Sequence, residues 1–439
     1  MKTKRLEYID ILRSVAILMM LEGHFMTHSL LPVFRDPLNP IYAVWKFTRG
    51  LTAPLFLSVS GLIFTYLLLQ SSTQGWSNPR VQKGLKRGIT LIAIGYFLQF
   101  NLYTHFFSER PLFTSLTQIF HVLQCIGTSL ILLITIYLIK TYILKIPLGF
   151  LLGIMGLLVV IISPTLYAME YTYLPRFIEN ILITSKDTTL KTSVFPLFPW
   201  SGYVFLGGAL GSVIYTLKHK ANHFLFPFGL IVSGVLVQLL TYPLLAGIQK
   251  LPLFNLLKSF KYGYEPVRFC QVLIFIGLII LLQKGITTLR TQTLFDVPKI
   301  VVRNLIGISF GLGCYLFTTP LETPLQNIVA YSLFFIPIVL GMWKLSNWNY
   351  QTFIKIGQNT LSVYVLHVIL LYQGFFGFRL DILIKNKLTP FFSISGAILF
   401  IFFFLAYTQY EPVLIQILHR IKVRYKIIKR KVQYRTSTI

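Results

Sequence analysis

Long apolar runs separated by short polar segments fill most of the chain between residues 11 and 409. A helix needs about 20 mostly apolar residues to cross the hydrocarbon core of a bilayer. Runs of this kind predict twelve spans, at roughly 11–31, 52–70, 87–104, 118–139, 144–163, 199–217, 223–246, 267–283, 303–319, 325–343, 357–376 and 391–409. The ninth is the weakest, because three glycines interrupt it. The pattern therefore predicts an all-α, polytopic membrane bundle of about 10–12 transmembrane helices.

The same pattern predicts a simple domain organisation. No internal repeat, low-complexity linker or second domain interrupts the apolar runs. No small-x-small cleavage site follows the first run, so we expect a retained helix rather than a signal peptide. We predict one transmembrane domain over 1–418, followed by a basic cytoplasmic tail over 419–439.

Composition and charge support a membrane location. Hydrophobic residues make up 55% of the 439 residues and charged residues only 12%, whereas soluble domains carry roughly 25% charged residues. The net charge of +27 comes from short basic clusters between the apolar runs. With the N-terminus inside and twelve spans, most Lys and Arg residues fall on the inner side, which predicts a cytoplasmic N-terminus and C-terminus. We therefore expect membrane lipids, and no nucleic acid, as partners.

The cysteines predict neither a disulfide framework nor a metal site. Cys125, Cys270 and Cys314 each lie in or beside an apolar run, and no CxxC or histidine-rich spacing accompanies them. Small buried side chains are the simplest interpretation.

The first predicted helix carries an unusual set of ionisable residues, namely Asp10, Arg13, Glu22 and His24. At 100° and 1.5 Å per residue, Arg13 and His24 lie about 20° apart around the helix and about 16 Å apart along it. Asp10 lies one turn before Arg13 on nearly the same face, and Glu22 points roughly the other way. Ionisable groups inside a span are costly and indicate function by default. A snorkelling Arg13 paired with Asp10, and a His24 that only joins helices, remain structural alternatives.

Four motifs, in order along the chain, resemble a known superfamily. The segment "RLEYIDILRSVAILMMLEGHF" is similar to the opening of the transmembrane acyltransferases, and Arg13 and His24 have the R-x10-H spacing of the acyltransferase-3 proteins. "FHVLQCIGTSLIL" (120–132) and "FPWSGYVFLGGALG" (198–211) resemble segments of the heparan-α-glucosaminide N-acetyltransferase branch. "IKIGQNTLSVYVLH" (354–367) is similar to a helix found across the superfamily. Departures include Ser14 in place of a usual glycine, and His121 and Cys125 in place of Gly and Arg.

The resemblance implies an enzyme that moves an acetyl group from cytosolic acetyl-CoA to a hydroxyl or amine of a sugar or glycan. His24 would be the general base or a covalent acetyl carrier, because its ordinary pKa lies near neutrality. Arg13, oriented by Asp10, would bind a phosphate of CoA or orient the site, and His367 is a second acid–base candidate. Further phosphate ligands are expected in the second inner loop: Arg80, Lys83, Lys86 and Arg87. Positive-inside residues, and a packing role for His367, are the structural alternatives.

Other functional classes remain open from the sequence. A membrane-bound O-acyltransferase of a different fold also places a histidine in an apolar stretch, but leaves the Arg13–His24 spacing unexplained. A secondary transporter suits twelve spans with both termini inside, although such proteins usually show two matching halves. A third alternative is a polysaccharide-handling partner that retains the fold without the chemistry. The family branch implies an integral protein of a bacterial inner membrane.

Overall fold

The computed structural model describes residues 7–99, 119–168, 175–184, 193–217, 225–248, 264–291, 350–372 and 380–436. Within these ranges the chain is helical, and its β-structure is limited to one isolated bridge between Leu30 and Leu388. Its α-helices are α1 (Glu7–Ser29), α2 (Pro40–Leu69), α3 (Pro79–Phe97), α6 (Val122–Tyr142), α7 (Leu148–Ala168), α8 (Arg176–Leu182), α9 (Leu197–Thr216), α10 (Leu225–Ile248), α11 (Tyr264–Thr291), α14 (Thr360–Tyr372), α15 (Leu380–Ile384) and α16 (Pro390–Thr436). The predicted all-α fold is thus confirmed for the described residues.

Five of the described helices are long and apolar enough to cross a membrane. They are Pro40–Leu69, Val122–Tyr142, Leu148–Tyr167, Leu197–Thr216 and Pro390–Pro412. A bent pair, Tyr350–Gln358 with Thr360–Tyr372, adds a sixth when it is counted as one span. The protein is therefore a polytopic helical membrane protein, as predicted. The expected spans at 303–319 and 325–343 lie outside the described residues.

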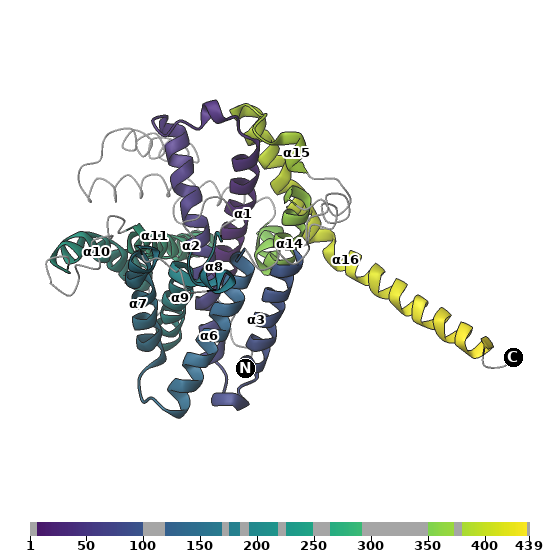
Figure 1. Cartoon of the computed structure of the whole chain (residues 1–439), viewed down its shortest axis with the longest axis horizontal. Helices are drawn as coiled ribbons and strands as arrows, with labels where there is room; N and C mark the ends of the chain where they lie inside the picture. The colour runs from purple at the N-terminus through teal and green to yellow at the C-terminus, as the bar shows by residue number, and fades with distance from the viewer. Residues whose placement is uncertain are drawn as a thin grey trace.

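Helix α9 is the centre of the bundle, with α2 packed along one side and α7 along another (Figure 1). The α2–α9 contact brings two backbones together. A Cβ on Gly61 would lie 1.9 Å from the carbonyl oxygen of Val204, and one on Gly207 would lie 2.0 Å from that of Ser58. Membrane helices associate through small residues of this kind, because lipid tails supply no hydrophobic drive between helices. Glycine is therefore required on both sides of this contact.

Helix α1 packs against α2, α14 and α16, so its polar residues face other helices. A sharp bend of 81° between the helix Tyr350–Gln358 and α14 lies against its first turns. We call this bend at Asn359 the elbow. A Cβ on Gly357 would lie 2.3 Å from Ser14 Oγ and 2.6 Å from the Asp10 carbonyl oxygen, so glycine permits the close approach. Ser14 Oγ also hydrogen-bonds the carbonyl oxygen of Phe353, at 2.5 Å.

The elbow differs from the single straight span predicted over 357–376. The apolar pattern predicted no bend, because the first arm carries polar residues such as Gln351 and Lys355 and was left outside the predicted span. The two arms are held at this angle by contacts to α1, which lies about 340 residues earlier in the chain.

Helix α16 continues without interruption from its apolar part into the basic segment that was predicted as a separate tail. Figure 1 shows its C-terminal part leading away from the other helices. Two side-chain hydrogen bonds join its middle to the elbow region: Asn359 donates to Glu411, and Gln409 Nε2 donates to Thr352 Oγ1 over 2.7 Å.

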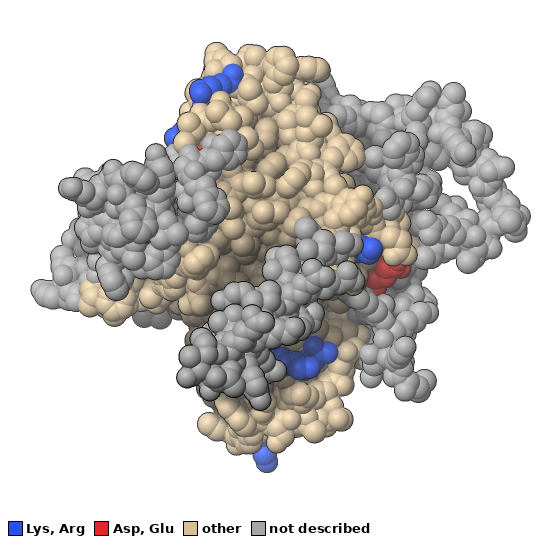
Figure 2. Space-filling model, turned by 90° about the vertical axis from the view of Figure 1, so that its right-hand side faces the viewer, with Lys and Arg blue, Asp and Glu red and all other residues tan. Residues whose placement is uncertain are grey.

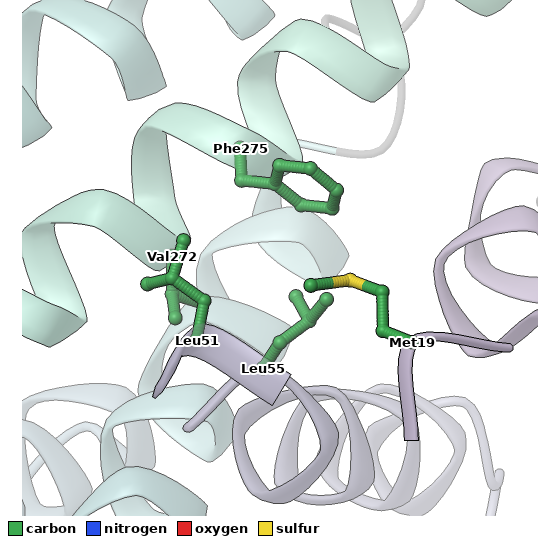
Figure 3. A pocket seen from close by; sticks show the side chains of 5 residues that line it. All are labelled: Met19, Leu51, Leu55, Val272 and Phe275. Carbon is green, nitrogen blue, oxygen red and sulfur yellow. The ribbon is translucent and has the colours of Figure 1, made fainter. Parts of the chain in front are cut away.

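The outer surface is largely uncharged. Figure 2 shows one face on which the described charged side chains are few and widely separated. Large apolar side chains such as Phe150 on α7, Leu236 on α10 and Phe402 on α16 are about half exposed or more, which suits contact with lipid. A small hollow between α1, α2 and α11 is lined only by apolar side chains, including Met19, Leu55 and Phe275 (Figure 3). It carries no polar group, so we regard it as part of the core.

Candidate active site

The structure brings His24 of α1 and His367 of α14 into direct contact. Nδ1 of His24 and Nε2 of His367 are hydrogen-bonded at 3.1 Å, although the residues lie 343 positions apart. The ring centroids are 5.1 Å apart. His367 is completely buried, whereas His24 retains some exposure. The pair therefore has a buried partner and an accessible one, and Nε2 of His24 is the ring nitrogen left outside this bond.

Aromatic rings surround the histidine pair. The ring of Tyr364, one turn before His367, packs edge-on against it with centroids 5.0 Å apart. The ring of Tyr372 contacts both His24 and His28, at centroid distances of 5.8 and 4.7 Å. All of these partners come from α1 and α14, so the spacing of histidines and tyrosines on these two helices builds the site.

Arg13 and Asp10 hold the elbow that positions α14. Arg13 Nη2 donates to Thr360 Oγ1 over 3.1 Å and to the carbonyl oxygen of Gln358 over 3.4 Å. Asp10 lies 3.9 Å from the Arg13 guanidinium and accepts from Gln358 Nε2 over 3.5 Å. The last carbonyls of a helix lack partners within it, and Arg13 supplies one where Tyr350–Gln358 ends. His367 lies two turns beyond Thr360 on the same helix, so the contact between Arg13 and Thr360 fixes the position of His367.

A cleft with a basic wall opens beside the elbow. Its walls come from α1, α2, α3, α6 and α14, and its empty volume, including the open mouth, is about 960 Å³. The basic residues that line it are Arg13, Arg80, Lys83 and Arg87. Apolar side chains, among them Phe64, Leu123 and Ile126, line much of the rest. We call this space the basic cleft.

The structure places the predicted basic residues on a helix rather than in a loop. Helix α3 begins at Pro79, where the Asn78 side chain accepts from the Arg80 backbone N–H over 2.9 Å. This cap starts the helix eight residues before the predicted span. Arg80, Lys83 and Arg87 then lie at helical spacing along one face. Lys86 is exposed but does not line the cleft.

Helix α14 connects the basic cleft to the histidine pair. Thr360 and Tyr364 line the cleft, and the Tyr364 ring also packs against His367. Three residues of helix correspond to about 4.5 Å of rise. The cleft therefore ends close to the histidines, with one aromatic side chain between them.

A second polar cluster, which the sequence interpretation missed, lies near His24 on the α2 side. Trp45 Nε1 donates to Glu22 Oε1 over 2.6 Å, and the Arg49 guanidinium lies 5.8 Å from the centre of the Trp45 ring. The predicted span began at residue 52, which placed Trp45 and Arg49 outside any helix. The N-terminal signal Asn39–Pro40 marks the true start of α2, since Asn39 caps the helix and proline suits its first turn.

Two further observations complete the site. Gln124 of α6 is fully buried against Gly95, and its amide atoms have no hydrogen-bond partner among the described residues. Among the residues that the structure describes, no group of three His, Cys, Asp or Glu side chains is arranged to hold a metal ion. The chemistry that these residues can support is acid–base or nucleophilic chemistry at the histidine pair, beside a cleft that suits an anionic ligand.

Comparison with known proteins points to one family. The family model described as heparan-alpha-glucosaminide N-acetyltransferase, catalytic, matches residues 5–237. This region holds His24, Arg13 and the basic face of α3, whereas the elbow and His367 come from beyond it. No curated protein matches the chain. Because the match covers more than half of the chain, this protein belongs to the heparan-alpha-glucosaminide N-acetyltransferase catalytic family.

Proposed function

We propose that the protein is a membrane acetyltransferase that moves the acetyl group of acetyl-CoA onto a hydroxyl or amine of a sugar or glycan. The observation that carries the proposal is the contact between His24 and His367 at the end of the basic cleft. The family assignment supports acetyl transfer as the chemistry. Transporters also use histidines as proton relays, so the family assignment is what favours an enzyme over a transporter.

The basic cleft fits the donor. Acetyl-CoA combines phosphates with a long, uncharged thioester arm, and the cleft combines cationic side chains with apolar walls. Arg80, Lys83 and Arg87 are the candidates for the phosphates, because arginine and lysine bind phosphate through charge-assisted hydrogen bonds. Arg13 lines the same cleft but is also committed to the elbow, so its main role in the proposal is to position α14. Asp10 acts with it.

His24 is the proposed catalytic residue. Its Nδ1 is hydrogen-bonded to Nε2 of His367, so Nε2 of His24 is the ring nitrogen that can react. For Nε2 to carry a lone pair, Nδ1–H of His24 must donate to Nε2 of His367. His367 then orients the ring and fixes its tautomer, which is the role of the third group in catalytic triads.

Two routes give the same overall reaction. In direct transfer, Nε2 takes the proton of the acceptor hydroxyl or amine, whose oxygen or nitrogen bonds to the thioester carbon as the carbon–sulfur bond breaks. In the relay, Nε2 itself bonds to that carbon and later passes the acetyl group to the acceptor. In both routes the CoA sulfur leaves with the electron pair of the broken bond and ends as a thiol, having gained the acceptor's proton.

The arrangement along α1 suggests a direction of transfer. Arg13, at the basic cleft, lies about 16 Å from His24 along the helix, and His24 retains exposure near the other end. With the N-terminus in the cytoplasm, as the positive-inside pattern predicts, the cleft opens toward cytosolic acetyl-CoA. The acceptor would then approach His24 from the opposite face of a bacterial inner membrane.

Label transfer tests the proposal directly. Membranes expressing the wild type or His24→Ala at equal levels would receive radiolabelled acetyl-CoA and a glycan extract. We expect label in the glycan for the wild type and a loss of about 10²- to 10⁴-fold in rate for the variant, the range for a removed acid–base group. Equal transfer by both would remove His24 from the mechanism. If neither transfers label and acetyl-CoA does not bind the purified protein, the enzyme assignment is wrong.

A further inference from the structure

Arg49 crosses α1 beside the proposed catalytic histidine. A Cβ built on Gly23 would lie 3.2 Å from Cγ, 3.6 Å from Cδ and 3.7 Å from Nε of Arg49. Gly23 directly precedes His24, so the arginine stem packs against α1 next to the histidine, and a side chain at position 23 would push the stem outward. The charge of Arg49 interacts electrostatically with His24, His28 and Tyr372. The guanidinium therefore belongs to the surroundings of the histidine pair.

The Arg49 side chain is held in place, and its charge interacts electrostatically with Glu22. Its guanidinium lies over the Trp45 ring, and Trp45 is fixed by its hydrogen bond to Glu22. Arg49 is exposed, and within the described part of the chain it makes no hydrogen bond and no salt bridge. An arginine whose stem is packed and whose fork is free can bind a planar or tetrahedral anion through two parallel hydrogen bonds.

The charges around this position favour an anion. The positive charges of Arg35, Lys385 and Arg49 all act on His28, and the negative charge of Asp381 acts on it in the opposite sense. Arg35 donates hydrogen bonds to the carbonyl oxygen of Leu30 and to Oδ1 of Asn386, so its guanidinium already has partners. Glu22 interacts electrostatically with Arg49, and its Oε1 accepts the hydrogen bond from Trp45. Arg49 is thus a cation that can meet a ligand arriving at the exposed side of His24.

We propose that Arg49 binds an anionic group, a carboxylate or a phosphate, on the acceptor saccharide and so presents its hydroxyl or amine to His24. This inference deepens the proposed function and rests on it. It separates the two substrates, with the donor phosphates on α3 and the acceptor anion on α2, and the histidine pair between them. Trp45 and Glu22 act as positioning residues, since they hold Arg49.

Direct binding to the full-length purified protein, without acetyl-CoA, tests this site. The probes are glucuronic acid for the carboxylate, glucose 6-phosphate for the phosphate and glucose as the neutral sugar. We expect the wild type to bind one anionic sugar more tightly than glucose, which also identifies the anion. Arg49→Gln should weaken binding of that sugar by at least about tenfold, equivalent to about 1.4 kcal/mol, and leave glucose unchanged.

Matched variants make the result specific. Lys46→Gln removes an exposed cation three residues earlier on the same helix, and we expect no change in the binding of either sugar. Arg49→Lys keeps the charge but loses the fork, so it should retain part of the affinity. The proposal is overturned when the wild type shows no preference for either anionic sugar, or when Arg49→Gln binds the preferred sugar as well as the wild type.

A parallel assay separates this inference from the proposed function. Transfer of label from acetyl-CoA to the three sugars would be followed with the same variants. Anion-dependent binding without any acetyl transfer would contradict the proposed function and leave the Arg49 site standing. Acetyl transfer with equal efficiency to charged and neutral sugars would contradict the Arg49 site and leave the acetyltransferase standing.

Discussion

At the scale of single residues, the hydrogen-bond partner of His24 comes from a helix near the other end of the chain. His367 is buried and shares one hydrogen bond with His24. The position of His367 depends in turn on the contact of Arg13 with Thr360. The R-x10-H spacing thus has two separate consequences. The histidine does the proposed chemistry, and the arginine places the residue that orients it.

A double-mutant cycle tests whether the two histidines work as a unit. We expect His24→Ala and His367→Ala each to lower kcat/KM, and the double variant to be no worse than His24→Ala alone, because residues that act together are strongly non-additive. His367→Gln offers an acceptor for the His24 Nδ1–H and should recover part of the activity that His367→Ala loses. Simple addition of the two losses, measured as free energies, would show that the residues act independently.

Whether the acetyl group passes through His24 is a separate question at this scale. Incubation of the purified protein with labelled acetyl-CoA alone, followed by rapid denaturation, would trap an acetyl group on the wild-type protein if the relay operates. We expect any such label to disappear in His24→Ala and on addition of acceptor, because the group would then be transferred. A wild-type protein that turns over acceptor but never carries label uses direct transfer.

At the scale of helices, close backbone contact decides the architecture. Gly61 and Gly207 let α2 and α9 touch, and Gly357 lets the elbow reach α1. Both contacts depend on the absence of a side chain. The same property explains why a glycine-containing motif around 354–367 accompanies the histidine: the glycine brings the elbow close, the threonine receives Arg13, and the histidine follows two turns later.

Adding one methyl group should distinguish the tight contacts from the loose ones. Gly61→Ala would place a Cβ 1.9 Å from a backbone oxygen that cannot rotate away. Overpacking of this kind typically costs about 1–3 kcal/mol, so we expect a lower melting temperature in detergent. Gly153→Ala on α7 is the matched control, because its nearest neighbour would be 3.9 Å away. Equal melting temperatures for the two variants would contradict the contact between α2 and α9.

Much of this could be predicted from the sequence, and the missing parts share a physical cause. Apolar run length predicted the helical membrane fold, and the polar stripe on the first helix predicted the placement of Asp10, Arg13 and His24 on one face. The elbow and the role of Arg49 were not predicted. Both depend on which helices touch, and a hydrophobic pattern gives the depth of a helix in the membrane but not its neighbours.

At the scale of the whole molecule, charge is separated along the bundle. The basic face of α3 lines one opening, whereas Glu22 and Arg49 lie at the level of His24, in the C-terminal part of α1. The large uncharged outer surface between them suits lipid. On the proposed mechanism, a donor from the side of the basic cleft and an acceptor from the exposed side of His24 would react without a continuous pore.

The basic face of α3 should control affinity for the donor. We expect Lys83→Glu to raise the Kd for acetyl-CoA by about tenfold or more, since hydrogen bonds to charged groups contribute roughly 1.5–3 kcal/mol. Lys86→Glu makes the same charge change three residues away but outside the cleft, and should have a much smaller effect that vanishes at high salt. Isothermal titration in detergent would measure both. Equal weakening by the two variants would mean that net charge, rather than the cleft, attracts the donor.

The hydrogen bond between His24 and His367 also has a consequence for biosynthesis. The first half of the pair enters the membrane early in translation, but its partner is made 343 residues later. The α16 residues that hydrogen-bond to the elbow are made later still. On the proposed mechanism, a nascent chain that already carries the R-x10-H motif and the basic face of α3 would lack the histidine pair, and so would be inactive, until its later helices are inserted.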